Sequence, residues 1–251
     1  MDKYISAELY KVIHRRSYTL GLLAFLLGGE ALLLFLLKTA GFSNATTFND
    51  VLGVLPMTLS MGLYLVPAIV DIVFSDQYKQ NTLKNEVSYG LPRGRIYLGK
   101  LVTACFTAVA FCALVLAFYV GLGTLMFSTR DAALTANQFA ALGRSLAAAL
   151  PVWLGGLGFI HMLLFVTKGS VSATVIYIIV LSAGNILSLA GLFLPRLAEL
   201  FAAIQDWLIA APMDGILRGA PDIPNAWLIG ILWLGVSTLI GLFCFQKREI
   251  N

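Results

Sequence analysis

Three titratable side chains lie inside long apolar stretches, and they are the residues that could do chemistry there. Glu30 lies near the middle of the first stretch, Asp71 near the end of the second, and His161 in the fourth. Ionisable groups in membrane segments are costly and by default mark a substrate path or a proton relay. Glu30 fits a cavity lining that contacts a cationic substrate, and equally a protonated or internally paired structural carboxyl. For Asp71, close to the interface, and for His161, as a hydrogen-bonded packing residue, we favour structural roles.

Motifs of soluble enzymes are not matched. The two histidines form no H-E-x-x-H pair, no G-x-S-x-G elbow occurs, and the three cysteines lie in apolar runs without metal-ligand spacing. Residues 94–100 fit the first seven places of the phosphate-binding G-x-x-x-x-G-K-[ST] loop, but Leu101 replaces the hydroxyl residue. That motif also needs a preceding strand and a soluble helix. We therefore expect a non-catalytic chain with no nucleotide or metal cofactor of its own.

The longest polar segment between two apolar stretches covers residues 76–100 and reads DQYKQNTLKNEVSYGLPRGRIYLGK. Five of the 17 lysine and arginine residues lie in it. Such a density of positive charge between membrane spans marks the cytoplasmic side. Pro92 and Gly94 favour a firm turn before the chain re-enters the membrane. We expect a structured cytoplasmic loop that contacts another protein.

The composition indicates a polytopic membrane protein. Hydrophobic residues make up 59% of the 251 residues and charged residues 12%, whereas soluble domains have roughly 45–50% and about 25%. The net charge of +4 comes from basic residues spread over several membrane flanks. Because these form no groove-like cluster, nucleic acid is not an expected partner. The positions of the basic residues instead indicate which side of the membrane each loop occupies.

The apolar pattern predicts one all-α transmembrane domain, 1–251, with six spans. About 20 residues are needed to cross a hydrocarbon core of about 30 Å. The third span is longer than one crossing requires, so it should tilt or project beyond the bilayer. We place the spans at 18–38, 52–74, 97–127, 146–167, 170–194 and 226–245.

An amphipathic helix is predicted before the first span, over residues 1–17. Its apolar residues recur at helical spacing and basic residues lie among them, which favours a helix on the cytoplasmic leaflet with its apolar face in lipid. A cleaved signal peptide is disfavoured because the following apolar run is too long and lacks a cleavage site. The apolar residues are Tyr4, Ile5, Leu9, Val12 and Ile13.

Charge counts orient the chain. With the N-terminus inside, twelve lysine and arginine residues lie on the cytoplasmic side and five on the other, so both termini should be cytoplasmic. The fourth and fifth spans should form a tight cytoplasmic hairpin around Lys168 and Gly169. Outside, residues 195–225 should form one or two short interfacial helices broken by prolines. That segment fits either a cap on a translocation path or a linker resting on lipid.

The polar loop carries a family resemblance. An acidic residue after the second span (Asp76), a Thr82-Leu83-Lys84 turn, a Pro92-Arg93 turn and Gly99-Lys100 at the third span resemble the membrane subunit of a type-2 ATP-binding-cassette exporter. Six spans and a leading amphipathic helix complete the likeness, which covers essentially the whole chain. Many members have glutamate at the position of Asp76 and glycine before the threonine, where this chain has Asn81.

The resemblance implies a permease that pairs with a separate cytoplasmic ATPase, which holds ATP and magnesium. It implies two permeases, identical or paralogous, and two ATPases in a bacterial cytoplasmic membrane. The polar loop, 76–96, would hold the coupling helix that fits into a groove of the ATPase. The residues expected to couple to the ATPase are Asp76, Tyr78, Lys79, Thr82, Lys84, Glu86, Pro92 and Arg93.

The expected cargo is an amphipathic peptide, because compact permeases with short external loops resemble exporters of lantibiotics, bacitracin-like antibiotics and cytolytic peptides. Spans with few buried charges also suit such a cargo better than a polar one. The alternative is a proton-coupled secondary transporter that uses Glu30, Asp71 and His161, although no convincing internal repeat is visible. A third possibility is a structural or sensory subunit that recruits a cytoplasmic partner.

Overall fold

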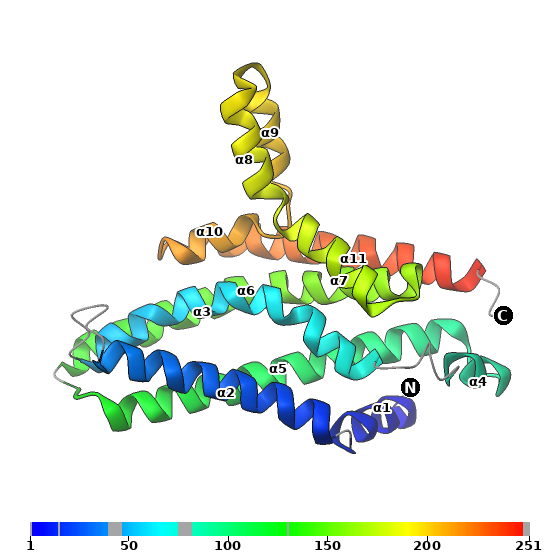
Figure 1. Ribbon diagram of the computed structural model, residues 1–251, viewed down its shortest axis with the longest axis horizontal. Helices are drawn as coiled ribbons and strands as arrows, with labels where there is room; N and C mark the ends of the chain where they lie inside the picture. Colours follow the sequence, from blue (N-terminus) through cyan, green and yellow to red (C-terminus); the bar gives the residue numbers. More distant parts are fainter. Residues whose placement is uncertain (1, 15, 40–46, 75–81, 130, 248–251) are drawn as a thin grey trace.

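The computed structural model describes residues 2–14, 16–39, 47–74, 82–129 and 131–247. Long helices pack side by side into an elongated bundle, and two shorter helices project from it (Figure 1). In chain order the elements are α1 Asp2–His14, α2 Arg16–Thr39, α3 Phe48–Phe74, α4 Thr82–Ser88, α5 Arg93–Met126, α6 Ala132–Thr167, α7 Ser170–Leu181, α8 Ala183–Phe193, the short 3₁₀ helix η1 Pro195–Leu197, α9 Ala198–Gln205, α10 Ala211–Leu217 and α11 Ile223–Lys247.

The predicted all-α membrane architecture is confirmed. Five helices (α2, α3, α5, α6 and α11) are long and apolar enough to cross a membrane, and the bent pair of α7 and α8 brings the number to six if it counts as one span. The described residues contain no strand, only an isolated bridge between Thr47 and Ser128. The chain is therefore a multi-pass membrane protein.

Two of the long helices exceed one membrane crossing. The third predicted span corresponds to α5, which has 34 residues, or about 51 Å at 1.5 Å per residue. The fourth, placed at 146–167, lies within α6, which has 36 residues and begins earlier, at Ala132. Its start is fixed by Asp131, whose carboxylate accepts hydrogen bonds from the backbone amides of Ala133 and Leu134.

The fifth predicted span, 170–194, corresponds to two helices that form a bent pair. α7 and α8 meet at Ser182 at an angle of 46°. The side-chain amide of Gln205 donates to the carbonyl of Gly184 at 2.9 Å and to Oγ of Ser188 at 2.8 Å. A side chain bonded into the helix ladder beside a glycine is a physical cause of such a kink.

The segment 195–225 contains the short helices that the sequence predicts, η1, α9 and α10. Pro221 lies in the gap between α10 and α11, but two other prolines open helices instead of breaking them. Pro195 opens η1 and Pro212 lies in the first turn of α10, a position that tolerates the missing N–H. The break between α9 and α10 instead covers residues 206–210.

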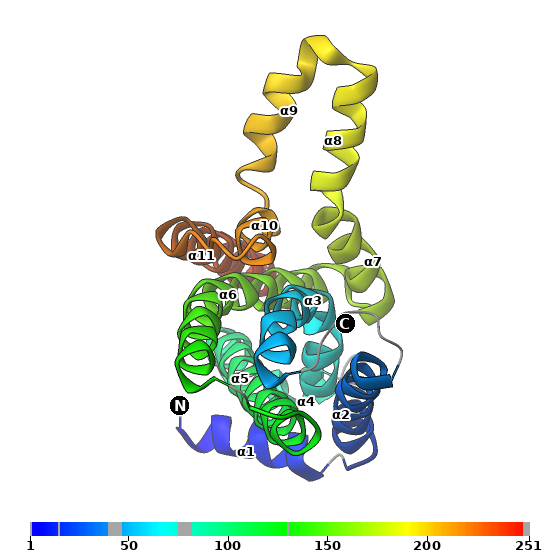
Figure 2. The same cartoon turned by 90° about the vertical axis from the view of Figure 1, so that its left-hand side faces the viewer.

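α6 lies at the centre of the bundle, between α3 and α11 (Figure 2). Small residues allow its close approach to α11, since a Cβ atom on Gly230 would collide with the backbone of Pro151. Such contacts between small residues are the usual means of helix association in membranes. The helices most exposed on the bundle surface are apolar, as lipid contact requires.

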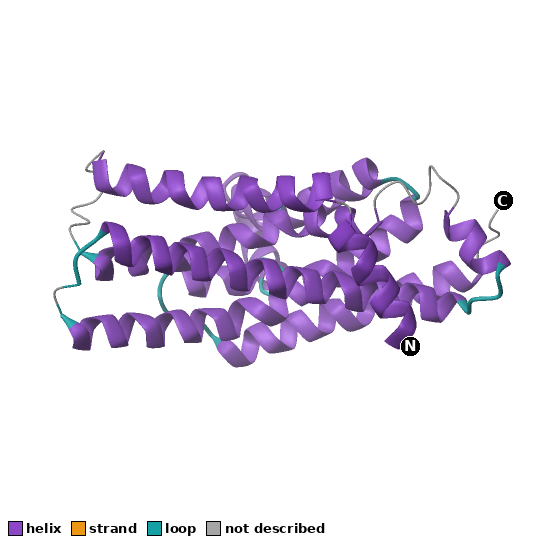
Figure 3. Cartoon of the chain, turned by 90° about the horizontal axis from the view of Figure 1, so that it is seen from below, coloured by secondary structure: helices purple, strands orange, loops and turns teal. Residues whose placement is uncertain are grey.

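The first and last described helices, α1 and α11, share one end of the bundle. Figure 1 shows α1, α4, the turn between α6 and α7, and the end of α11 at this end, and Figure 3 shows long helices running between it and the opposite end. We call it the junction end. At the opposite end α5 passes into α6. α8 and α9 form a hairpin that leaves the bundle sideways and has no buried residue (Figure 2).

Candidate functional site

The junction end contains a buried cluster of charges that joins α1, α4 and α5. Nζ of Lys100 lies 3.0 Å from Oε2 of Glu8 and 3.7 Å from Oε1 of Glu86. Nζ of Lys11 lies 2.5 Å from the other oxygen of Glu8 and 3.3 Å from Oε1 of Glu86. The hydroxyl of Tyr4 donates to Oε2 of Glu86 at 2.9 Å. We call these five residues the polar junction.

The polar junction balances its charges internally. The side chains of Lys100 and Glu8 are 0% and 1% exposed, whereas Lys11 is 48% exposed. Two carboxylates therefore share two ammonium groups, which a buried charge requires. Removing one member would leave the remaining charge without compensation.

The surroundings of the polar junction favour the charged forms of Glu8 and Lys11 and the neutral form of Tyr4. Burial raises the pKa of Glu8, but the attraction of Lys100 and Lys11 outweighs it and lowers the pKa overall. Burial lowers the pKa of Lys11, and the hydrogen bond and attraction to Glu8 raise it overall. Burial, reinforced by Glu8 and Glu86, raises the pKa of Tyr4, so its hydroxyl remains a donor.

α1 packs closely onto α5 because Gly99 has no side chain. A Cβ atom at Gly99 would collide with the ring of Tyr4. Val12 is also buried against the bundle, and Ile13 is exposed. The expectation that the whole apolar face of residues 1–17 lies in lipid is therefore wrong for Tyr4 and Val12, because Gly99 and the polar junction bring that face onto α5.

α4 attaches by one side and is exposed on the other. Glu86 and Val87 are half-buried against the bundle, whereas Lys84 and Ser88 are exposed, as is Tyr89 at 88%. The helix ends at Ser88 and is capped at Gly90 (φ +82°), where the amides of Gly90 and Leu91 donate to the carbonyls of Val87 and Glu86. This is a Schellman cap, which suits glycine.

The turn into α5 is therefore made by Gly90 and Pro92, and the expected contribution of Gly94 is not seen. Gly94 lies inside the first turn of α5, where a Cβ atom would meet open space. Pro92 precedes α5 in an extended conformation, with φ −59° and ψ 131°. Its carbonyl accepts from the amides of Arg95 and Ile96, which starts the helix.

Arg93 connects this turn to the end of the chain. Its Nη1 atom donates to the carbonyls of Phe245 and Gln246 at 3.0 and 2.7 Å. These are carbonyls of the last turn of α11, which lack partners within the helix and attract a cation. Arg93 therefore anchors the C-terminal helix, and its charge is not simply available to a partner.

The structure describes only some of the other loop residues that the sequence predicts to couple to an ATPase. Asp76, Tyr78 and Lys79 lie outside the described residues. Thr82 begins α4, although its side chain is also outside the description. Of the expected coupling residues, the structure brings Glu86 into the polar junction and leaves Lys84 on the exposed side of α4.

His161 is fully buried in the C-terminal third of α6, within the buried run 155–165. Its Nε2 atom lies 3.1 Å from the carbonyl oxygen of Tyr97, and its Nδ1 atom is buried without a hydrogen-bond partner. The rings of Phe74, Tyr97 and Phe165 surround it at 4.6 to 5.2 Å. These contacts are those of an aromatic packing residue.

Glu30 and His161 belong to different parts of the bundle. Glu30 is half-buried on α2, its Oε2 atom has no hydrogen-bond partner, and it interacts electrostatically with Tyr119 of α5. His161 contacts Tyr97 of α5, and 22 residues of helix between Tyr97 and Tyr119 correspond to about 33 Å. Asp71 is half-buried near the end of α3. The predicted intramembrane trio therefore does not form one site.

Sequence reasoning missed Glu8, Tyr4 and Lys100 as site residues. Lys100 falls inside the predicted third span, so the rule that singled out Glu30 applies to it equally. Glu8 precedes Lys11 by three residues on a mainly basic helix, which is a spacing for a helical ion pair. The pairing across 92 residues, however, has no sequence signal.

No group of three histidine, cysteine, aspartate or glutamate residues within the described ranges could hold a metal ion. No protein-family model matches this chain, and no curated protein matches it.

Proposed function

We propose that this chain is the membrane subunit of an ATP-driven exporter and that a separate cytoplasmic ATPase docks on α4. The observation that carries the proposal is the two-sided environment of α4. One side bonds through Glu86 into the polar junction, and the other side, with Lys84 and Tyr89, is exposed. An element of this kind suits the transfer of a push from a partner to the transmembrane helices.

The transfer has a defined route. A displacement of α4 moves Glu86, and Glu86 is bonded to Tyr4 of α1 and paired with Lys100 of α5. α5 then moves with α1 as a unit, because Glu8 holds Lys100 to α1. ATP-driven closure of two ATPases would in this way bias the spans between inward-open and outward-open packings.

The proposed cargo is an amphipathic peptide, and the proposed assembly has two copies of the chain. The exposed apolar surface of α5 and of the α8–α9 hairpin supplies area for lipid or for a second copy. With the junction end in the cytoplasm, both termini lie there, in agreement with the positive-inside bias. ATP and magnesium belong to the ATPase.

A proton-coupled transporter is the second candidate, and the buried oxygen of Glu30 that lacks a partner favours it. Its weakness is the separation of Glu30 from His161, since a proton relay needs neighbouring groups. Adding a protonophore while ATP is maintained distinguishes the two. Transport should continue in an ATP-driven exporter and stop in a proton-coupled one.

The direct test is co-purification with an ATP-binding-cassette ATPase encoded beside this chain, followed by ATP hydrolysis with and without an amphipathic cationic peptide. A stable complex whose hydrolysis the peptide stimulates supports both the exporter and its cargo. A complex without stimulation supports the exporter and contradicts the cargo. The absence of a complex contradicts the proposal.

A further inference from the structure

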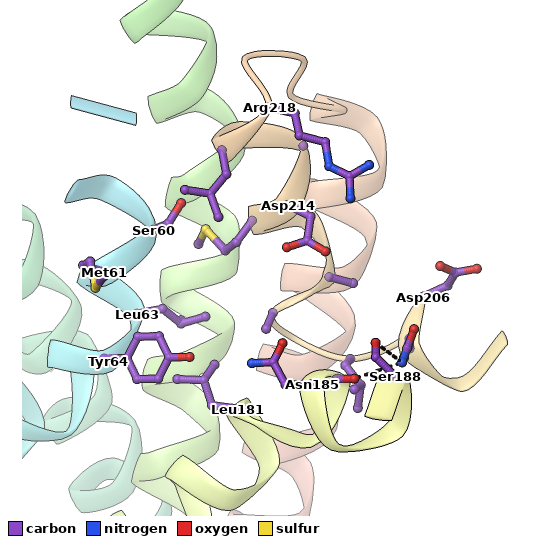
Figure 4. Close-up of a pocket in the computed structure, with 18 of the residues that line it drawn as sticks. Ser60, Met61, Leu63, Tyr64, Leu181, Asn185, Ser188, Asp206, Asp214 and Arg218 are labelled. Carbon is purple, nitrogen blue, oxygen red and sulfur yellow. Dashed lines mark hydrogen bonds between the residues drawn. The ribbon is translucent and has the colours of Figure 1, made fainter. Parts of the chain in front are cut away.

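A cavity of about 700 Å³ lies beside α3, at the bend between α7 and α8 (Figure 4). α3 forms one wall, the base of the α8–α9 hairpin another, and α10 a third. The bend creates this space, because a straight continuation of α7 would carry α8 along the bundle. The hydrogen bonds of Gln205 to Gly184 and Ser188 fix the rim.

Apolar and polar surface contribute to the cavity wall in nearly equal parts, and the apolar part is adaptable. A volume of this size falls in the range of pockets for small organic ligands. Methionine side chains are flexible and polarisable, so they adjust to ligands of irregular shape. The apolar lining includes Met57, Met61, Leu63, Leu181, Leu208 and Met213.

Polar groups interrupt this lining from three elements. Figure 4 shows Tyr64 of α3, Asn185 of α8 and Asp214 of α10 directed into the cavity, with Asp206 at its edge. The carboxylates of Asp206 and Asp214 have no hydrogen-bond or ion-pair partner among the described residues. Both aspartates are exposed, so a charged group that enters the cavity can reach their carboxylates.

The charge of the lining is negative on balance. Arg218 is its single cationic residue, and it forms no ion pair with Asp206 or Asp214. One guanidinium against two carboxylates leaves one negative charge in excess. A cation would find the carboxylate of Asp214 beside the apolar part of the wall, with Asp206 farther out at the edge.

We infer that this cavity binds the cationic head of an amphipathic molecule, an ammonium or guanidinium group attached to an apolar body. Asp214 accepts a charge-assisted hydrogen bond from the head, and the amide oxygen of Asn185 accepts a second. The ring of Tyr64 adds a cation–π contact. The methionine and leucine side chains contact the apolar body.

This inference deepens the proposed function by naming the chemistry that selects the cargo, and it rests on that proposal only for transport. Binding to the isolated chain needs no ATPase. If the cavity does not bind a cation, the proposal that the chain forms a complex with an ATPase is not affected. If no complex with an ATPase forms, the inference that the cavity binds a cation is not affected.

The test uses the full-length chain in phosphatidylcholine nanodiscs and three probes of similar size, 4-phenylbutylamine, 4-phenylbutanol and 4-phenylbutyrate. Calorimetric titration should show the amine binding at least about tenfold more tightly than the alcohol and the carboxylate. Equal affinity for the amine and the alcohol would overturn the inference.

Matched variants locate the binding site. Asp214→Asn should weaken amine binding about tenfold, whereas Glu199→Gln should leave it unchanged, because Glu199 is an exposed carboxylate of α9 outside the cavity. Tyr64→Phe, which keeps the ring, should retain binding within about threefold. Unchanged affinity in a folded Asp214→Asn protein would overturn the assignment. If Asp214→Asn does not fold, Tyr64→Leu serves as the test variant, and it should lose binding.

Two further arms separate the sources of such a cation. Loss of probe binding in nanodiscs that contain phosphatidylethanolamine would identify a lipid amine as the occupant. Competition by a peptide of alternating lysine and leucine pairs would identify a peptide cargo. If neither competes, the inference about a natural amphipathic cation is wrong.

Discussion

Lys100 and Glu8 are 92 residues apart in the chain, yet they form an ion pair of 3.0 Å that is almost completely buried. Buried pairs of this kind add little net stability, because desolvation offsets the attraction, and their best-attested effect is to fix which elements meet. The pair therefore specifies how α1 lies on α5.

Replacing Lys100 alone should destabilise the protein strongly. Lys100→Met leaves Glu8 with only the half-exposed Lys11 as a partner, so we expect a loss of about 3–5 kcal/mol in the free energy of unfolding. Unfolding by denaturant in detergent micelles measures it. The control is Lys84→Met on the exposed side of α4, which should change stability by less than about 0.5 kcal/mol.

The double variant Glu8→Gln with Lys100→Met separates charge from packing. Because it removes both charges together, it should recover more than half of the loss caused by Lys100→Met. An additive loss in the double variant would show that the two residues do not interact across the polar junction.

The attachment of α1 should depend on pH in a defined direction. The folded-state pKa of Glu8 is lowered from its ordinary value of 4.5, so its contribution is fully present above that pH and disappears as pH falls through the lower folded value. Lys11 has a raised pKa, so its contribution is present below its ordinary value of 10.5 and disappears at higher pH.

Hydrogen exchange of α1 amides measures this attachment. Protection should be constant between about pH 5 and pH 10, once corrected for intrinsic exchange, and should decrease in acid. In Glu8→Gln the decrease in acid should be reduced, whereas in Glu199→Gln it should persist. An acid decrease that is identical in the wild type and in Glu8→Gln would contradict the role of Glu8.

The contact between Gly99 and Tyr4 can be tested with a matched pair of glycines. Gly99→Ala should displace α1 and lower stability by about 1–3 kcal/mol, because the new Cβ atom collides with the Tyr4 ring. Gly94→Ala adds the same methyl group to α5 in open space and should be neutral or slightly stabilising. Equal effects in thermal unfolding would contradict the close approach.

The sequence predicted the helices better than their ends and bends. Apolar length alone locates α2, α3, α5 and α11, because crossing a bilayer demands it. It could not locate the bend at Ser182, since that depends on Gln205 reaching Gly184 from a later helix. It also could not extend α6 back to Ala132, where a local cap by Asp131 decides the start.

Of the polar junction, only Glu86 was named as a site residue from the sequence. The family resemblance of the loop implies a coupling role for Glu86 and Lys84, and that role stays a prediction. Lys100 and Glu8 were missed as a pair because tertiary packing brings α1 against α5. The spacing of residues along the chain does not predict that contact. Arg93 was assigned to coupling, whereas the structure bonds it to the end of α11.

His161 gives a test of the proton-coupled alternative. His161→Phe keeps the aromatic packing and removes one hydrogen bond, to the carbonyl of Tyr97, so stability should fall by about 1 kcal/mol. Transport measured in proteoliposomes should remain. Loss of transport in a stably folded His161→Phe protein would favour the proton-coupled transporter.

The docking of an ATPase on α4 is the central claim, and site-specific photo-crosslinking tests it most directly. A photoreactive phenylalanine in place of Tyr89, on the exposed side of α4, should crosslink to the co-expressed ATPase. The same probe in place of Phe193, an aromatic residue that is also largely exposed on α8, should not. Crosslinking from position 193 but not from position 89 would contradict the account.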